Sequence, residues 1–176
     1  MINHLETERL ILRPLEIEDA PELFIMDYNP LVHKYLWNRP TEDIRESIQI
    51  IEGVQLQYQI HKIGRFATIL KENGAFIGWT GIKFVTDHIE NGNTNFYDFG
   101  YRLNSPFWNK GYASEATNAW LDFGFNTMKI KELNAYTHSE NGASNKVLQK
   151  NGFQFMETYP DPENVLWNWW ILSNNK

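Results

Sequence analysis

Gly111 lies in a short segment, WNKGYASEA (residues 108–116), whose residue types could bind a phosphate group. The segment is expected to begin a helix, and the first backbone N–H groups of a helix have no partner inside it and lie at the positive end of its dipole. Such groups can bind a pyrophosphate. A glycine leaves room for the phosphate, and the small Ala113 and Ser114 keep the entrance open. Glycine is also common at helix starts that bind nothing, so this pattern alone leaves both interpretations open.

Other common ligand motifs are absent from the sequence. Neither the phosphate-binding pattern GxxxxGK[ST] nor the dinucleotide pattern GxGxxG occurs. The five histidines are scattered without the spacing of metal ligands, so no metal site is predicted. The chain has no cysteine, which excludes disulfides and a cysteine-acyl intermediate. An acyl transfer would therefore need direct attack by the acceptor, or a serine, lysine or carboxylate nucleophile.

Length and composition indicate one domain over residues 1–176. Hydrophobic residues make up 42% of the chain, enough for a core, and the net charge of −6 argues against a nucleic-acid partner. No apolar run approaches the length needed to span a membrane, and the first residues lack a signal-peptide pattern. We therefore expect a cytoplasmic protein without a membrane partner.

The periodicity of the hydrophobic residues predicts a mixed α/β (α+β) fold. Thr41 is a plausible N-cap of its helix, and Asn73-Gly74 is a strong hairpin signal. Helices are expected to flank a mostly antiparallel sheet that has one parallel crossover through residues 111–128. The expected strands are 8–15, two runs within 66–85, 95–103, 131–137, 153–160 and 165–173, and the expected helices are 17–29, 30–37, 41–62, 111–128 and 142–151.

Three segments together resemble the GNAT superfamily of N-acetyltransferases, in its RimJ/RimL (ribosomal-protein N-acetyltransferase) branch. WNKGYASEA looks like the pyrophosphate loop [R/Q]-x-x-G-x-[G/A], ENGASNKVLQKNGFQF looks like an N-x-x-S…K-x-G-F segment, and ETERLILRPLEIEDA looks like the first strand and helix of that branch. The resemblance spans residues 6 to 172, approximately. Each segment is weakly specific, but their common order makes the match strong.

The resemblance implies a GNAT acyl-CoA N-acyltransferase fold and acetyl-CoA as cosubstrate, without a metal. Trp108 stands where the superfamily has Arg or Gln, and Asn109 replaces the usual Gly, which Asn can do because it tolerates unusual backbone angles. Asn141 is expected to cap its helix and to contact the pantetheine arm, and Asn145 is expected near the phosphorylated end. The implied cofactor-binding residues are Leu103, Asn109, Lys110, Gly111, Tyr112, Ala113, Ser114, Asn141 and Asn145.

The resemblance also implies an acidic catalytic residue on the strand before the loop. Strand alternation places Asp98, Gly100 and Arg102 on one face. Asp98 is the candidate base, acting through water because its side chain is short. The alternative is that Asp98 merely pairs with a nearby cation such as Arg102 or a lysine.

The proton donor to the leaving thiolate is the second expected catalytic residue. Many GNAT enzymes have a tyrosine where this chain has Leu148. Ser144 is the substitute that the RimJ/RimL branch suggests, and the alternative is a serine in the first turn of its helix. His138, at the end of the strand before this helix, is a further candidate for proton transfer. The simpler interpretation is a histidine at the surface or in a loop.

The sequence does not name the acceptor amine. A protein N-terminal α-amine and a small-molecule amine both fit, and a non-catalytic acyl-CoA-binding sensor is the alternative from another class. His33, Tyr35 and Trp37 are placed on the acceptor side by the resemblance, with core packing as the alternative for Tyr35 and Trp37. The tryptophans of the last strand, 167, 169 and 170, either close the core or leave one face for a homo-oligomer partner.

Overall fold

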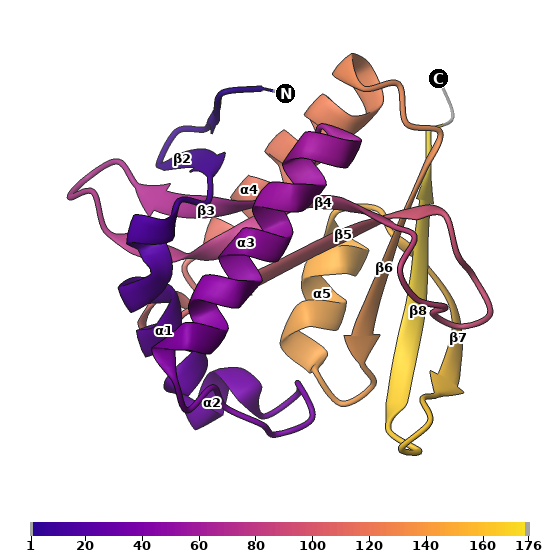
Figure 1. Cartoon of the computed structure of the whole chain (residues 1–176). Helices are drawn as coiled ribbons and strands as arrows, with labels where there is room; N and C mark the ends of the chain where they lie inside the picture. The colour runs from indigo at the N-terminus through magenta and orange to yellow at the C-terminus, as the bar shows by residue number, and fades with distance from the viewer. Residues whose placement is uncertain (1, 175–176) are drawn as a thin grey trace.

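The chain forms one continuous eight-stranded sheet in a computed structural model that describes residues 2–174 (Figure 1). The strands lie in the order β1-β2-β3-β4-β5-β6-β8-β7. Their bounds are β1 (Leu5–Glu6), β2 (Leu10–Pro14), β3 (Arg65–Leu70), β4 (Phe76–Val85), β5 (Phe96–Leu103), β6 (Glu132–His138), β7 (Gln154–Pro160) and β8 (Leu166–Ser173). The expected strands are thus confirmed, and the two-residue β1 is an addition.

Every neighbouring pair of strands is antiparallel except β5 and β6. These two run parallel, and the chain between them passes through the helix after β5, so the expected crossover is confirmed. Among the described residues, β5 and β6 share a single registered pair, Asp98 with Asn134. The strands therefore diverge beyond this pair, toward their carboxyl ends.

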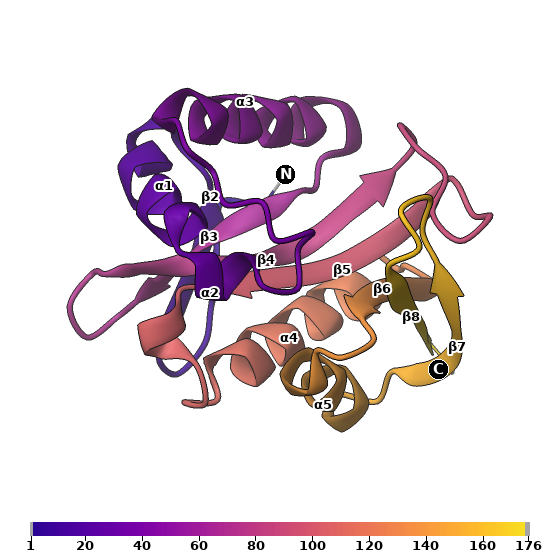
Figure 2. The same cartoon turned by 90° about the horizontal axis from the view of Figure 1, so that it is seen from below.

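Helices cover both faces of the sheet, as the view from below shows (Figure 2). α1 (Ala20–Tyr28), α2 (Pro30–His33) and α3 (Ile44–His61) lie on one face, and α4 (Tyr112–Asp122) and α5 (Gly142–Lys150) lie on the other. Short helical turns join some elements: η1 (Ile17–Asp19), η2 (Ser105–Phe107) and η3 (Phe123–Thr127). Both faces of β3 are consequently buried along its whole length.

Apolar side chains form a core on each face. On the α4 face, Trp120 is fully buried and packs edge-on against Phe66, with ring centroids 5.0 Å apart. On the other face, Leu23 and Ile51 are fully buried with Ala67 of the sheet. Burial on this scale supplies the main driving force for folding, and it holds both groups of helices against the central strands.

The helix expected to begin at Thr41 begins three residues later. Asp43 is its N-cap: its side chain accepts a hydrogen bond from the Arg45 N–H, and Glu46 completes a capping box. Thr41 instead is buried, and its N–H donates to the carbonyl of Asp27. The prediction of Thr41 as cap was wrong because a carboxylate two residues later satisfies the free N–H groups.

The tryptophans of β8 close the core. Alternation places Trp167 and Trp169 in one cluster and Trp170 in another, as expected. All three are buried, with exposures of 3%, 3% and 6%. These residues therefore leave no face for a partner, and the interpretation as an interface was wrong.

No helix within residues 2–174 combines the length and the apolar character that crossing a membrane would require.

Candidate functional site

The loop between β5 and α4 has the backbone conformation that the glycine pattern predicts. Gly111 is the N-cap of α4 with φ +83°, and Asn109 has φ +59°. Both values lie in the left-handed region, which glycine and asparagine adopt most readily. The sequence therefore places these two residue types where the turn requires them.

The N–H groups of this loop are free to bind an anion. Within the described part of the chain, no hydrogen bond uses the N–H of residues 109–114, and no side chain caps α4. The first helical bond after the loop runs from the Glu115 N–H to the Gly111 carbonyl. Unpaired N–H groups at the positive end of a helix are the features that favour phosphate binding.

Trp108 explains how the loop tolerates the loss of the superfamily's Arg or Gln. Its indole Nε1 donates to the carbonyl oxygen of Leu103, 2.6 Å away, at the end of β5. This bond fixes the start of the loop to the strand. Trp108 therefore has a structural role in the same loop, while Leu103 itself is buried.

β5 and β6 separate beyond their single registered pair, Asp98 with Asn134. β5 ends at Leu103, close to the loop that begins α4, and β6 ends at His138, shortly before α5. The figures show α4 and α5 on the same side of the sheet (Figures 1 and 2). A ligand held by the loop on this side can reach the opposite face only where the two strands have separated.

Ser144 lies in the first turn of α5 and faces β5. Its Oγ is 3.1 Å from the hydroxyl of Tyr101, which donates to it. Burial raises the pKa of Tyr101 to about 12, against a smaller lowering by Ser144. Tyr101 thus remains a neutral hydroxyl at physiological pH, and the two hydroxyls form a proton-donating pair.

Asn141 caps α5, as expected. Its side chain accepts a hydrogen bond from the N–H of Ser144, 3.2 Å away. The cap fixes the serine at the first turn of α5, as the helix-start interpretation expects, and the catalytic role of Ser144 stays a prediction. Contact between Asn141 and a pantetheine arm stays a prediction.

Asn145 is used inside the protein. Its Oδ1 accepts from the Thr137 hydroxyl at 2.6 Å, and its Nδ2 donates to the Ser139 carbonyl at 3.0 Å. Asn168 of β8 also donates to Oδ1 at 3.4 Å. These bonds tie α5 to β6 and β8. Cofactor binding by Asn145 stays a prediction, and its side chain could contact a cofactor only while it keeps these bonds or by exchanging one of them.

Asp98 lies on the opposite face of the sheet and is 2% exposed. Its Oδ2 accepts a hydrogen bond from the guanidinium of Arg65 on β3, and the same guanidinium also donates to the Asp98 carbonyl. Among the described residues, no hydrogen bond reaches the other carboxylate oxygen, Oδ1. Asp98 therefore has a cation as partner, as the alternative interpretation expected, but the cation is Arg65 rather than Arg102.

Arg102 pairs instead with Asp27 of α1. Its Nη1 donates to Asp27 Oδ1 at 2.9 Å, and His33 Nε2 lies 3.6 Å from the same oxygen. Burial alone would raise the pKa of the Asp27 carboxyl, but His33 and Arg102 lower it below its usual value. No local sequence pattern indicates this ion pair, because its members are 75 residues apart.

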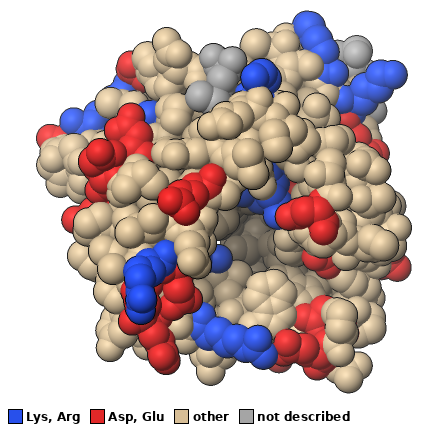
Figure 3. Space-filling model, in the orientation of Figure 1, with Lys and Arg blue, Asp and Glu red and all other residues tan. Residues whose placement is uncertain are grey.

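A cavity of about 260 Å³ lies beside Arg102 on this face. Figure 3 shows the molecule in the orientation of Figure 1, hollowed near its centre, with acidic and basic side chains around the opening. His33 and Trp37 line the cavity, which agrees with their expected place on the acceptor side. The remaining lining residues are Leu36, Arg39, Arg102 and Glu163.

The segment after α2 reaches across to the turn between β7 and β8. Trp37 Nε1 donates to Asp161 Oδ2 at 2.9 Å, and its ring packs against Trp167 with centroids 4.8 Å apart. Tyr35 packs similarly on His138, at 5.2 Å. His138 is therefore part of an aromatic wall, and its Nδ1 accepts from the Glu140 N–H.

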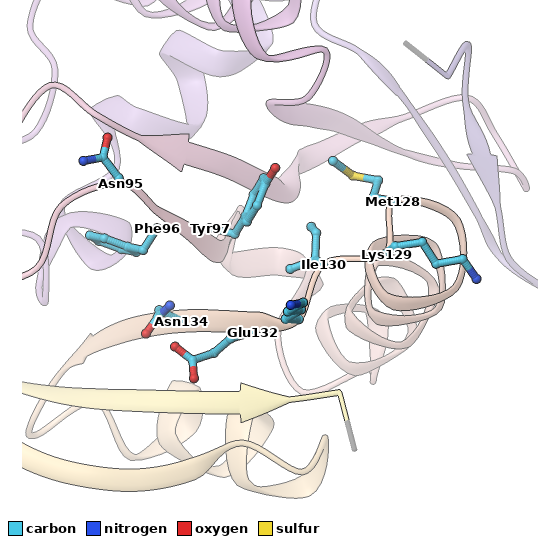
Figure 4. Close-up of a pocket in the computed structure, with 9 residues that line it drawn as sticks. Asn95, Phe96, Tyr97, Met128, Lys129, Ile130, Glu132 and Asn134 are labelled. Atoms are coloured by element: carbon cyan, nitrogen blue, oxygen red, sulfur yellow. The ribbon is translucent and has the colours of Figure 1, made fainter. Parts of the chain in front are cut away.

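A second hollow, of about 360 Å³, lies at the amino ends of β5 and β6 (Figure 4). Its lining includes Asn95 and Tyr97 of one strand segment and Glu132 and Asn134 of the other. None of the predicted site residues lines it.

Within residues 2–174, no three His, Cys, Asp or Glu side chains are grouped so that they could hold a metal ion.

Comparison with known proteins decides the family. The model of the acetyltransferase (GNAT) domain matches residues 9–154, most of the chain. The chain belongs to the GNAT acetyltransferase family.

Named relatives and solved structures agree with this assignment. The N-acetyltransferase p20 of Bacillus licheniformis, which is itself uncharacterised, is 37% identical over 153 residues, covering 85% of this chain and 82% of the relative. The ribosomal-protein acetyltransferase RimL, solved in complex with coenzyme A, has the same fold with a TM-score of 0.79 at 18% identity, covering 97% of each chain. The microcin self-immunity acetyltransferase MccE, solved with acetyl-CoA and AMP, has a TM-score of 0.76 at 20% identity. The match covers 95% of this chain and 93% of MccE.

Proposed function

We propose that this GNAT protein transfers the acetyl group of acetyl-CoA directly to a primary amine, in a complex that holds both substrates. The observation that carries the proposal is the gap between β5 and β6. In the proposal, the two substrates meet at this gap, with the free N–H groups and Ser144 on one face of the sheet and Asp98 and the cavity beside Arg102 on the other. Direct attack requires donor and acceptor to meet, and the gap would provide the place.

The residues of the loop fit the diphosphate of coenzyme A. The free N–H groups of residues 109–114 would donate to its oxygens, and Gly111 allows the left-handed turn that presents them. The proposed set is Leu103, Asn109, Lys110, Gly111, Tyr112, Ala113 and Ser114, with Asn141 and Asn145 at the start of α5. Acetyl-CoA supplies an activated thioester carbonyl when it is bound there.

Asp98 would receive the proton of the attacking amine through water. Because Arg65 binds Oδ2, Oδ1 is the oxygen left to accept a proton, and the low exposure of the carboxylate makes direct contact with the amine difficult. An α-amine has an ordinary pKa of about 7.7–8.0, against about 10.4 for lysine. A base that is buried and can act only through water therefore suits an α-amine or another amine of low pKa better than an ordinary lysine side chain.

Ser144 would donate a proton to the sulfur of the leaving thiolate. Tyr101 would pass its own proton to the Ser144 oxygen as the serine proton goes to the sulfur, because the two hydroxyls are bonded, and the tyrosinate would regain a proton from water. Tyr101 is the member of this pair that the sequence did not identify. No covalent enzyme intermediate is needed, which agrees with a chain that lacks cysteine.

The acceptor is either a protein N-terminus or a small-molecule amine. A cytoplasmic location and a homo-oligomeric state also stay predictions from the sequence. The competing function, a sensor that binds acyl-CoA without turnover, gains some weight from the Arg65–Asp98 pair, because that pair leaves a single carboxylate oxygen for proton transfer.

Release of free coenzyme A thiol tests the proposal directly. A thiol reagent can follow the reaction without background, because the protein contributes no cysteine. Acetyl-CoA should be consumed with at least one member of a panel of N-terminal peptides and small amines, and not without an acceptor. If acetyl-CoA binds but no amine is acetylated, the sensor function replaces the enzymatic one.

A further inference from the structure

Two of the family-like segments, ETERLILRPL and WNKGYASEA, meet in space through Arg9. This arginine lies just before β2 and reaches the loop that begins α4, about a hundred residues along the chain. Its Nη1 donates to the Lys110 carbonyl at 3.0 Å, and its Nε donates to Glu115 Oε2 at 2.6 Å. The backbone N–H of Arg9 also donates to Glu115 Oε1 at 2.8 Å.

The guanidinium of Arg9 covers one flank of the loop. Its central carbon lies 4.5 Å from the centre of the Tyr112 ring. Its Nη2 would lie 3.3 Å from a Cβ atom built on Gly111. No hydrogen bond from Nη2 is found among the described residues, so this N–H group has donor capacity left beside the loop.

The charge of Glu115 explains why Arg9 lies beside this loop. This carboxylate lies in the first turn of α4, where it would repel a diphosphate. Burial alone would raise the pKa of Glu115, but hydrogen bonds from Thr7 and Arg9 lower it, so the group is charged. Arg9 compensates the negative charge and holds it away from the free N–H groups.

The loop itself brings no guanidinium to the site. Trp108 occupies the position where the superfamily has Arg or Gln, and its indole bonds to Leu103. Lys110 places its ammonium 5.7 Å from the Phe107 ring centre. A guanidinium beside the diphosphate would therefore have to come from another segment of the chain, and Arg9 is already bonded to the loop.

We propose that Arg9 is a binding residue for the diphosphate of coenzyme A, supplied by the segment before β2. Its Nη2 donates to a diphosphate oxygen, while Nη1 and Nε hold the Lys110 carbonyl and Glu115. The inference rests on the proposed function, because it assumes that acetyl-CoA lies on this loop.

Titration calorimetry with Arg9→Gln tests the role, using three ligands: coenzyme A, dephospho-coenzyme A, which lacks the 3′-phosphate, and pantetheine, which lacks the diphosphate. A hydrogen bond to a charged group is worth enough for about a tenfold change in affinity. We expect the dissociation constants of both nucleotide ligands to rise about tenfold or more, with that of pantetheine unchanged. Arg9→Lys should recover part of the loss, because it keeps the charge without the fork of donors.

Arg13→Gln is the matched control. Arg13 lies in β2, four residues after Arg9, and pairs with Asp19 at 2.6 Å, away from the loop. Its loss should lower the melting temperature without changing the affinity for any of the three ligands. This control separates a general loss of stability from a loss of diphosphate binding.

Three results would overturn the inference. They are a coenzyme A dissociation constant of Arg9→Gln within twofold of the wild type, an equal loss for pantetheine, and a loss confined to coenzyme A that vanishes with dephospho-coenzyme A. If Arg9→Gln does not fold, the test uses Arg9→Lys in its place. The ratio of its affinities for coenzyme A and pantetheine is then compared with that of the wild type, and an unchanged ratio counts against a diphosphate contact. A wild type that binds no coenzyme A would instead refute the proposed function itself.

Discussion

The two faces of the sheet present opposite kinds of site. The donor side, beside α4 and α5, is built from free backbone N–H groups and from two hydroxyls, Tyr101 and Ser144. The acceptor side, beside α1 and α2, is built from charged side chains that already have partners, such as Asp98 with Arg65 and Asp27 with Arg102. The donor side therefore offers groups ready to bind, whereas the acceptor side holds its charges in place.

Under the proposed function, this difference separates general diphosphate binding from selection of the acceptor. Main-chain N–H groups can bind any diphosphate in the same way, so on the donor side the proposal depends mainly on the loop conformation, with Arg9 as the one added side-chain ligand. An acceptor must be recognised by side chains of the right shape and charge. Four experiments would break or sharpen this comparison, and the largest expected effect comes first.

Replacing Asp98 by Asn should cost the most. Arg65 would remain buried without a counter-ion, and breaking a buried pair costs about 3–5 kcal/mol. We expect the free energy of unfolding in urea to fall by that amount, with reduced turnover and nearly unchanged affinity for acetyl-CoA below the melting temperature.

Glu163→Gln is the control for Asp98→Asn. This variant removes the salt-bridge partner of Arg39, and the side chains of Arg39 and Glu163 are 72% and 54% exposed. The free energy of unfolding should therefore fall by no more than about 1 kcal/mol. If the free energy of unfolding falls equally in the two variants, the buried Asp98–Arg65 pair contributes no more than a surface salt bridge, which would contradict the comparison.

Ser144→Ala should lower kcat about a hundredfold, because a positioned proton donor typically contributes at least that factor. The affinity for acetyl-CoA should stay within a few-fold, and the thiol-release assay measures both. Ser173→Ala, at the end of β8, serves as a control with normal kcat. A normal kcat in Ser144→Ala would remove the hydroxyl pair from the mechanism.

Gly111→Val should raise the dissociation constant for coenzyme A about tenfold or more. The left-handed conformation at φ +83° strains any side chain, and the new Cβ lies 3.3 Å from Arg9 Nη2. Gly74→Val is the matched variant, since Gly74 has φ +73° but open space around it. Both variants should lose about 1–2 kcal/mol of stability, but only Gly111→Val should bind coenzyme A more weakly. Equal affinities of the two variants for coenzyme A would refute the loop assignment.

Glu115 predicts a small pH dependence of stability. Its pKa in the folded protein lies below the ordinary 4.5, so it stabilises the fold above that pH and loses the contribution as the pH falls through its folded pKa. The difference in melting temperature between wild type and Glu115→Gln should therefore be full at pH 7 and shrink below pH 4.5. A difference that does not change down to pH 3 would show that the carboxylate charge contributes nothing.

The donor side could be predicted from the sequence because its determinants are local. Gly111 and Asn109 have the residue types that a left-handed turn requires, and Asn141 lies three residues before Ser144, as a cap does. The succession of strands and helices along the chain could be predicted from hydrophobic periodicity, since each pattern lies within one segment. The parallel crossover through residues 111–128 was inferred from that succession. Local signals of this kind do not depend on knowing which strands are neighbours.

The acceptor side could not be predicted in the same way. Arg65 and Asp98 lie 33 residues apart, and their contact depends on the register of β3, β4 and β5. Strand alternation placed Asp98 and Arg102 on one face but could not say that each would find a different partner. The Thr41 cap and the exposed tryptophan face were wrong for related reasons, because a nearby better cap and the burial of β8 decided the outcome.

A crystal structure of the complex with coenzyme A tests the central claim most directly. We predict that the diphosphate oxygens lie within hydrogen-bond distance of N–H groups in residues 109–114, with the pantetheine arm in the gap between β5 and β6 and its sulfur near Ser144. A diphosphate bound elsewhere, or a gap filled by the protein's own side chains in the complex, would contradict the account.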